Sequence, residues 1–201
     1  LSFDYDPDSV ACTREVKRRY FPEDGRWRIL EGSVLNKDFL ASLGRFDIVF
    51  SWGVLHHTGS MWQAIDNTLS LIKPGGLLAI AIYNDQGWKS TSWRRIKRLY
   101  CGAPRVLRPA FFLPAFFFYE LKGMAARGLH GEGLFASWRG RGPRGMSRLH
   151  DWIDWMGGYP FEVAQPEEVS AFLRDRGLHP VKFVACTGSG NNEFVFRSPE
   201  K

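Results

Sequence analysis

Asp4 stands directly after a short apolar run, in the segment FDYDP. If that run is a buried strand, the Asp4 carboxylate lies at its carboxyl end, where open α/β sheets hold a ribose. One carboxylate can accept hydrogen bonds from both the 2′ and the 3′ hydroxyl of that sugar. The alternative is that Asp4 joins Asp6 and Asp8 in stabilising the N-terminus of the following helix.

The segment EGSVLN, at residues 31–36, ends a second apolar run and offers three polar groups. The Ser33 hydroxyl, the Val34 amide and the Asn36 side chain could together read the edge of an adenine. Taken alone, the segment fits an ordinary turn at a strand end better. Its meaning therefore depends on what the neighbouring strand ends carry.

Two further apolar runs end in polar or glycine residues. Ser51, Trp52 and Gly53 stand where the run FDIVF ends, so their backbone would face the crevice beyond the strand ends. Gly53 permits the close approach of a ligand or unusual backbone angles. Tyr83 and Asn84 follow the run AIAI in the same way. Each segment alone reads as the end of a strand, but the four together predict a ligand crevice.

His56 and His57 follow Gly53 in a loop. Neighbouring side chains in a loop point in different directions, so at most one of the two is a candidate catalytic base. A structural role is the more frequent one for a loop histidine. Adjacent histidines are also poorly spaced as two ligands of one metal ion, and no third ligand lies nearby, so no metal site is predicted.

The runs that carry these residues alternate with helix-like segments. A helix should begin at Pro7, behind an N-cap at Asp6, with one face made by Cys12, Val16 and Tyr20. Further helices and strands are expected along the chain: a strand from Trp27 (WRILEG), a strand at RFDIVFS, a helix over 61–72, a turn at KPGG (73–76) and a strand over 77–83. The continuous apolar character of RFDIVFS suits a parallel strand covered on both faces. The alternation predicts an α/β sheet, mostly parallel.

The pattern changes near Trp88, which divides the chain into three predicted regions. Residues 1–88 form the cofactor-binding half of the core, and residues 89–161 form a helical, basic and aromatic insertion or lid that contains the Gly/Arg stretch RGRGPRG. Residues 162–201 complete the core with a helix from Pro166 and a β-hairpin whose turn covers Gly188 to Asn192.

The amino-acid composition limits the classes of protein to which the chain can belong. A chain of 201 residues with 44% hydrophobic residues can bury one sizeable core. Cys12, Cys101 and Cys186 are odd in number and widely spaced, which favours a reducing, cytoplasmic setting over a disulfide framework. The longest apolar stretch, at 109–119, is about half of the roughly 20 residues that span a bilayer, so no transmembrane segment is predicted.

The positive charge is concentrated in one segment. Residues 89–148 hold thirteen Lys or Arg against Glu120 and Glu132, whereas the whole chain carries a net charge of +6. This asymmetry is typical of a contact with an anionic partner such as phosphate, nucleic acid or acidic lipid. A solvated face, on which long basic side chains cover apolar surface, is equally compatible.

The four motifs together resemble the class I S-adenosylmethionine-dependent methyltransferases, in particular the small-molecule branch that includes ubiquinone-biosynthesis O-methyltransferases. FDYDPDSVA is similar to the acidic motif of that family's second strand, EGSVLN to its adenine-side motif, FDIVFSWGVLHH to its fourth-strand motif, and LIKPGGLLAIAIY to its helix, turn and fifth strand. The closing hairpin is similar to the family's antiparallel sixth and seventh strands. The fold implied is a Rossmann-like methyltransferase sheet with a helical insertion.

The resemblance implies a role for most of the site residues. Asp4 would hold the ribose of S-adenosylmethionine, Tyr5 would pack on the adenine, and Ser33 and Val34 would address its edge. The methionine moiety would be lined by Ser51, Trp52 and Gly53. Tyr83 and Asn84 are predicted to contact the substrate on a separate ground, because they follow an apolar run that ends at the same edge. In the resembling motif the second histidine lies at the turn toward the acceptor, so His57 is favoured over His56 as the catalytic base.

One departure from the family concerns its glycine-rich first loop and the strand before it, which are absent from the sequence. In the family's strand order that strand lies between the strands that end at Asp4 and Ser51, so the chain would leave two edges unpaired in the middle of its sheet. The sequence also begins at Leu1. We therefore expect an N-terminally truncated chain that is inactive by itself.

The expected function is methyl transfer from S-adenosylmethionine to a small-molecule or lipid-like acceptor, with O-methylation favoured. Anionic surface contact through residues 89–148 is a further expectation, and the sequence does not favour a nucleic-acid partner for the enzyme. The alternative from another class is a non-catalytic, degenerate methyltransferase fold that binds anionic lipid or RNA through its basic insertion.

Overall fold

The computed structural model describes residues 1–131, 133, 147–188 and 190–200, and the stretch RGRGPRG lies outside these residues. The chain divides into two compact units. Unit 1 comprises residues 1–84 and 164–201, and unit 2 comprises residues 85–163.

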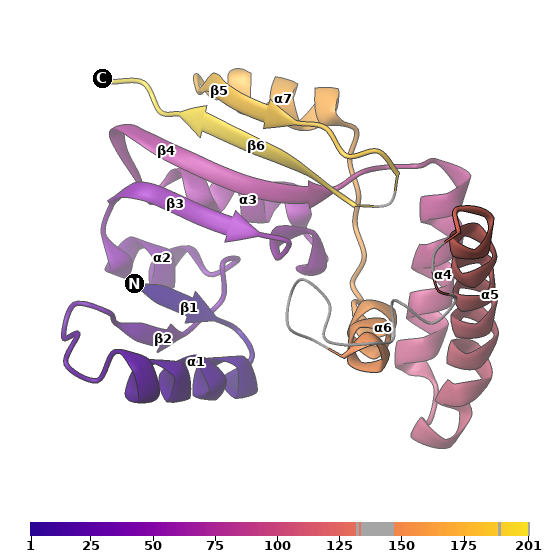
Figure 1. The fold of residues 1–201 in the computed structure, drawn as a ribbon. Helices are drawn as coiled ribbons and strands as arrows, with labels where there is room; N and C mark the ends of the chain where they lie inside the picture. Colours follow the sequence, from indigo (N-terminus) through magenta and orange to yellow (C-terminus); the bar gives the residue numbers. More distant parts are fainter. Residues whose placement is uncertain (132, 134–146, 189, 201) are drawn as a thin grey trace. The chain divides into compact units, whose positions relative to one another are not determined.

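Unit 1 contains two sheets (Figure 1). The first is a parallel pair of short strands, β1 (Ser2–Asp4) and β2 (Ile29–Glu31). The second has the order β3-β4-β6-β5, with bounds Phe46–Trp52, Ile72–Tyr83, Asn191–Arg197 and His179–Val184. The β3–β4 pair is parallel, and the hairpin strands β5 and β6 run antiparallel. The predicted α/β fold, mostly parallel with a C-terminal antiparallel hairpin, is confirmed.

The described residues of unit 1 form four helices, and capping side chains satisfy first-turn amides in all but the third, where the Ser60 side chain makes no such bond. The helices are α1 (Pro7–Tyr20), α2 (Lys37–Leu43), α3 (Met61–Leu69) and α7 (Pro166–Arg174), with a 3-10 turn, η1, at Leu55–His57. The Asp6 side chain caps α1 and the Asn36 side chain caps α2. Gln165 and Glu168 form a capping box at the start of α7. Helix starts are therefore set locally, by side chains within a few residues.

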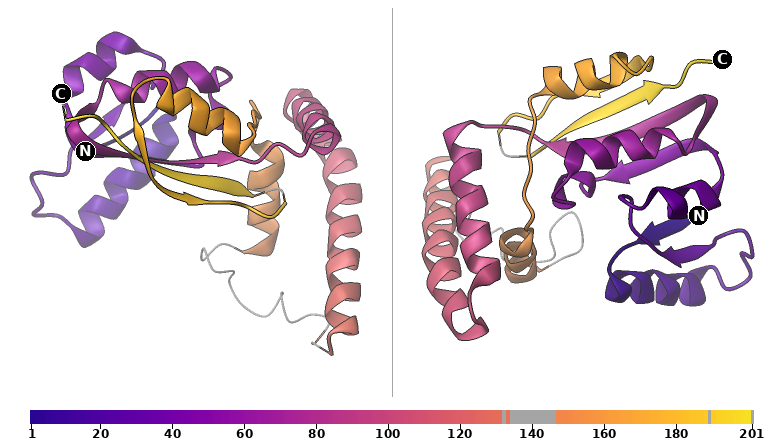
Figure 2. Two further views of the ribbon diagram at one scale, coloured as in Figure 1. Left: turned by 90° about the horizontal axis from the view of Figure 1, so that it is seen from above. Right: turned by 180° about the vertical axis from the view of Figure 1, so that it is seen from behind.

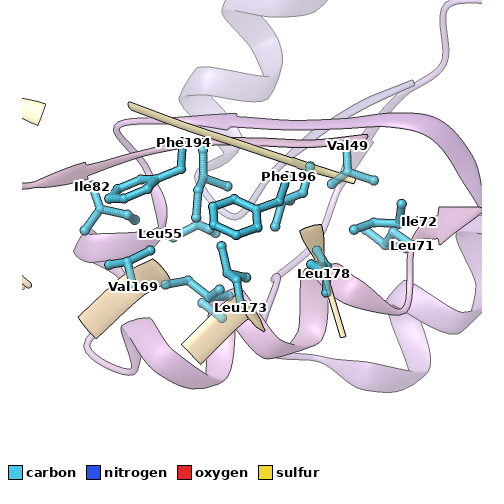
Figure 3. Packing of buried hydrophobic residues seen from close by; sticks show 14 of the residues in the cluster. Val49, Leu55, Leu71, Ile72, Ile82, Val169, Leu173, Leu178, Phe194 and Phe196 are labelled. Carbon is cyan, nitrogen blue, oxygen red and sulfur yellow. The ribbon is translucent and has the colours of Figure 1, made fainter. Parts of the chain in front are cut away.

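The core of unit 1 lies between the four-stranded sheet and its helices. Phe194 and Phe196 of β6 are buried against the apolar side of α7, where Val169 and Leu173 are 0% exposed. Figure 3 shows these side chains gathered with Ile82 of β4 and residues of the neighbouring elements. Apolar burial of this kind, at about 25 cal/mol per Å², is what holds the strand ends in fixed positions.

The prediction that the strand at RFDIVFS is covered on both faces is wrong. Only Val49 of β3 is deeply buried, whereas Ile48 and Phe50 are 63% and 66% exposed. The reason is that β3 is an edge strand of its sheet, and helices cover one face of that sheet at β3. A continuous apolar run thus identifies a strand but not the number of layers that cover it.

The predicted helix over 61–72 and turn at 73–76 also need correction. Helix α3 ends at Leu69, and residues 72–76 already belong to β4. The β3–β4 register shifts between Phe46 and Ile48, which accommodates the extra residues of KPGG as an irregularity of the strand. Gly75 has a φ of +72°, so a glycine is required inside this strand.

The expected apolar face of α1 is not a buried face. Cys12 is exposed, and Val16 and Tyr20 are 44% and 69% exposed. Val10, at 1% exposure, is the side chain that packs inward instead. The four-residue spacing was read correctly as helical, but it does not tell which side of the helix meets the sheet.

Unit 2 consists of helices (Figure 2). They pack around aromatic side chains. Its elements are α4 (Trp88–Gly102), a 3-10 turn η2 (Arg105–Leu107), α5 (Arg108–Leu129) and α6 (Arg148–Gly157). Tyr100, Phe112, Phe116 and Met156 form the buried cluster. No helix within the described residues is both long enough and apolar enough to cross a membrane.

Lys97 of α4 is a buried cation inside this aromatic cluster. It is 0% exposed, its Nζ donates to the Trp155 carbonyl oxygen, and the ring centroids of Trp155 and Phe161 lie 4.3 and 5.0 Å from Nζ. Loss of hydration on burial lowers the pKa of Lys97 to about 8 from its ordinary 10.5, against smaller raising effects of Cys101 and Asp154.

This depressed pKa predicts a pH dependence of stability. Between about pH 8 and pH 10.5 the unfolded chain binds more protons at Lys97 than the folded chain, so the free energy of unfolding should rise with pH across that window. Replacing Lys97 by Met should remove this rise, whereas the exposed Lys122→Met control should keep it. Urea unfolding at a series of pH values is the measurement, and parallel profiles for wild type and Lys97→Met would contradict the prediction.

Candidate functional site

The carboxyl ends of the parallel strands of unit 1 carry most of the candidate residues. Strand β1 ends at Asp4, β3 at Trp52 and β4 at Tyr83. Figure 1 shows the arrowheads of these three strands pointing the same way. Polar groups from separate segments therefore gather at one edge, as is usual for ligand sites in open α/β sheets.

Asp4 is held by a short turn at the end of β1. Its Oδ1 accepts a hydrogen bond of 2.9 Å from the Asp6 amide, while Oδ2 has no hydrogen bond to any residue that the structure describes. The cap of α1 is made by Asp6, whose carboxylate accepts from the Ser9 amide at 2.9 Å and the Ser9 hydroxyl at 2.7 Å. These bonds, chiefly that of the Ser9 hydroxyl, lower the pKa of Asp6. Asp4 is therefore oriented but retains an open acceptor.

The segment EGSVLN, at residues 31–36, is joined to Asp4 by a backbone hydrogen bond. The Gly32 amide donates to the Asp4 carbonyl oxygen at 2.9 Å. The Ser33 hydroxyl accepts from the Leu35 amide at 3.1 Å, which forms a local turn. The Val34 carbonyl oxygen accepts from the Asn67 side chain at 2.9 Å. Tyr5, beside Asp4 in the chain, is 78% exposed. The Ser33 hydroxyl thus shapes the loop in this structure.

Gly53 turns the chain sharply at the end of β3. Its φ is +74°, a backbone conformation that side chains with a Cβ rarely adopt. A Cβ placed there would lie 3.6 Å from Nδ2 of Asn191 on β6. Ser51 is partly buried, and Trp52 is 41% exposed with its ring stacked on that of Phe50 at 5.3 Å. The end of β3 therefore offers an aromatic surface beside an open backbone position.

The two histidines have different surroundings. His56 is 0% exposed, and its Nδ1 accepts from the Tyr83 amide at 3.3 Å, with the two rings 4.0 Å apart. His57 is only partly buried, and its ring meets the Tyr83 ring edge-on at 5.5 Å. His56 thus ties η1 to the end of β4, while His57 is the histidine within reach of solvent.

Asn84, which is predicted to contact the substrate, belongs to an asparagine cluster whose other members, Asn191 and Asn192, are not predicted as site residues from the sequence. Asn192 Nδ2 donates to Asn84 Oδ1 at 3.0 Å, and Asn84 Nδ2 donates to the Gly188 carbonyl at 3.2 Å, so the Asn84 amide group is engaged within the chain. The buried Asn191 Oδ1 accepts no hydrogen bond from the described residues. Both Asn191 and Asn192 belong to β6, so the hairpin turn is shorter than predicted.

The alternation in NNEFVFR is the signal that could have found this cluster. Asn192, Phe194 and Phe196 occupy alternate positions and are 1%, 0% and 2% exposed, respectively. A period of two places them on one face of a strand. Elsewhere in the described part of the chain, no three His, Cys, Asp or Glu side chains gather in a way that could hold a metal ion.

Comparisons with known proteins agree with this geometry. Residues 1–78 match the family described as "Methyltransferase domain". No curated protein matches the chain in sequence. Among solved structures, PKMT2 from Rickettsia typhi in complex with AdoHcy has a TM-score of 0.62 at 11% identity, over 98% of this chain and 44% of that one.

Two further structures share the fold. An O-methyltransferase family protein from Burkholderia thailandensis has a TM-score of 0.53 at 17% identity, over 99% of this chain and 43% of its own. A SAM-dependent methyltransferase from Methanosarcina mazei has a TM-score of 0.52 at 12% identity, over 99% and 81%. The chain thus spans less than half the length of two of these proteins. The likeness establishes a Rossmann-like methyltransferase fold.

Proposed function

We propose that the complete protein transfers a methyl group from S-adenosylmethionine to a hydroxyl of a small or lipid-like acceptor, an acceptor class like that of the ubiquinone-biosynthesis O-methyltransferases. The observation that carries the proposal is the Asp4 carboxylate, which is fixed at the end of a parallel strand with Oδ2 open. The methyltransferase-domain match over residues 1–78 supports it, because that span contains this strand end.

The residues present fit the cofactor at two points. Asp4 Oδ2 is an acceptor suited to ribose hydroxyls. Beside Gly53, the buried Asn191 Oδ1 is an acceptor suited to a donor such as the methionine ammonium group. The Val34 amide would address the adenine edge, since the Ser33 hydroxyl is engaged in its turn. Tyr5 would pack on the adenine and change its exposure on binding.

S-adenosylmethionine, when bound, supplies a methyl group on a positively charged sulfur. The contribution of this chain is to align the acceptor oxygen with that methyl group and to exclude water. His57 would take the proton from the acceptor hydroxyl, because its ring is partly exposed at the end of β4. His56 would position Tyr83, to which its ring is hydrogen-bonded through the backbone.

We also infer that a further strand completes the sheet between β1 and β3. Within the described residues, β1 pairs with β2 alone and β3 pairs with β4 alone. The backbone edge of β3 that faces away from β4 therefore has no strand partner among the described residues, and an unpaired edge is a template for pairing with another strand. A strand supplied by chain upstream of Leu1 would pair with both edges and bring its own loop to the cofactor edge.

Calorimetry with S-adenosylhomocysteine tests this proposal on two forms of the protein. The 201-residue chain is compared with a version extended by its natural upstream sequence, and the extended form should bind more tightly because its sheet is complete. Transfer of labelled methyl from S-adenosylmethionine to hydroxyl-bearing acceptors by the extended form then tests the chemistry. Equal affinities would contradict the added strand, and an extended form that binds no cofactor would contradict the function.

A further inference from the structure

Helix α5 carries apolar side chains on the side that faces away from its own unit. Phe112 and Phe116 are buried against the other helices of unit 2. Leu113, Phe117 and Leu121 form a row one turn apart and are 43%, 55% and 62% exposed. A helix that is apolar all round is normally covered, so this row calls for a partner.

The exposed apolar surface extends beyond that row. Phe118 of α5 is 62% exposed, and Val106 and Leu107 of η2 are 82% and 53% exposed. Leu129, the last residue of α5, is 88% exposed. We call the side chains Val106, Leu107, Leu113, Phe117, Phe118, Leu121 and Leu129 the α5 apolar surface. Exposed apolar surface of this extent marks an interaction site in a soluble protein.

The charge around this surface is of one sign. The segment from Trp88 to Leu129 contains nine Lys or Arg, and its only acidic residue, Glu120, is 3% exposed and accepts a hydrogen bond of 3.0 Å from Trp152 Nε1. Arg105 lies next to Val106, and Lys122 follows Phe118 by one turn. The partner should therefore be apolar where it meets α5 and negatively charged around it.

We propose that α4 and α5 bind the surface of a membrane that contains acidic phospholipids, with the α5 apolar surface at the boundary of headgroups and acyl chains. An amphiphilic surface of this kind combines acyl chains for the Phe and Leu side chains with phosphates for Arg105 and Lys122. The helix lies on the bilayer and does not span it, in keeping with its modest apolar length. The inference is independent of methyl transfer, although it would bring a lipid-like acceptor close to the enzyme.

Two other occupants fit the same observations less well. A second copy of the chain would bring two strongly basic surfaces together without an exposed acidic residue between Trp88 and Leu129 to compensate. Nucleic acid would satisfy the charges and could stack on Phe117 and Phe118, but the five Leu and Val side chains of the surface would stay exposed to water. Acidic lipid alone satisfies the charge and the apolar row together.

Vesicle flotation tests the proposal on the extended protein described above. Wild type should float with phosphatidylcholine vesicles that contain about 30 mol% phosphatidylserine, and much less with pure phosphatidylcholine. The double variant Phe117→Gln/Leu121→Gln should lose about tenfold or more in partitioning. Arg105→Gln/Lys122→Gln should lose about fivefold per charge, and its binding should fall less with salt than that of wild type.

The matched control is Val181→Gln on β5, an apolar residue of unit 1 that is 52% exposed. This variant should float like wild type, and circular dichroism should show that every variant keeps its helices. The proposal is overturned if wild type fails to bind phosphatidylserine vesicles, if it binds neutral vesicles equally, or if Phe117→Gln/Leu121→Gln retains its affinity. It is also overturned if sedimentation shows a dimer that this same variant dissociates.

Discussion

Replacing Asp4 by alanine should weaken the binding of S-adenosylhomocysteine by about 30- to 1,000-fold, the equivalent of one or two charge-assisted hydrogen bonds. The carboxylate is held at the end of β1 by the Asp6 amide, so its open Oδ2 needs little ordering before it binds a ribose. Calorimetry on the extended protein measures the loss. The fold should survive, because Asp4 is a partly buried residue at a strand end and contributes one local hydrogen bond.

Asp8→Ala is the matched control for this experiment. Asp8 is an exposed carboxylate in the first turn of α1, so its loss changes the charge at the helix N-terminus but removes no ribose contact. Its affinity should stay close to wild type. If the affinity of Asp4→Ala for S-adenosylhomocysteine remained within about twofold of wild type, Asp4 would not be the ribose contact. Asp6 would then be the first alternative to test.

Replacing His57 by alanine should lower kcat by about 100- to 10,000-fold, the usual worth of a positioned base. A hydroxyl oxygen attacks strongly only as its proton leaves, and imidazole accepts protons near neutral pH. His57 is partly exposed at the edge of the Tyr83 ring, whereas His56 is buried and bound to the Tyr83 amide. Cofactor affinity should change little, because the substitution removes no proposed cofactor contact.

His57→Gln separates proton transfer from hydrogen bonding. Glutamine can keep a contact to the acceptor but cannot take its proton, so kcat should fall nearly as far as in the alanine variant. The acid limb of the pH–rate profile should also disappear, since that limb reports protonation of the base. A glutamine variant with near wild-type kcat and an unchanged profile would show that His57 only orients groups, and alignment of the acceptor would then carry the catalysis.

The order and type of most elements in unit 1 can be predicted from the amino-acid sequence, because the relevant signals are local. Asp6 and Pro7 mark the start of α1 through a cap that reaches only three residues. The alternation from Asn191 to Arg197 marks β6 because a strand repeats every two residues. Site residues such as Asp4 and Gly53 could be named for the same reason, since they stand directly after apolar runs.

What covers each element, and what each polar side chain contacts, depends on the three-dimensional packing of the chain. The run that contains Ile48 and Phe50 has the apolar character of a doubly covered strand, yet both are exposed because helices cover only the opposite face of the sheet at β3. The predicted turn KPGG is part of β4, and a register shift against β3 accommodates it.

The histidines and asparagines also show that a residue's contacts are set by packing and not by the local sequence. His56 and His57 are equivalent in sequence, but β4 buries the first against the Tyr83 amide and leaves the second accessible. Asn84 and Asn192 bond to each other across more than 100 residues of chain. Burial and hydrogen bonding depend on neighbours that are distant in the sequence, whereas caps and periodicity depend on neighbours within a turn or two, so a pattern can specify an element without specifying its environment.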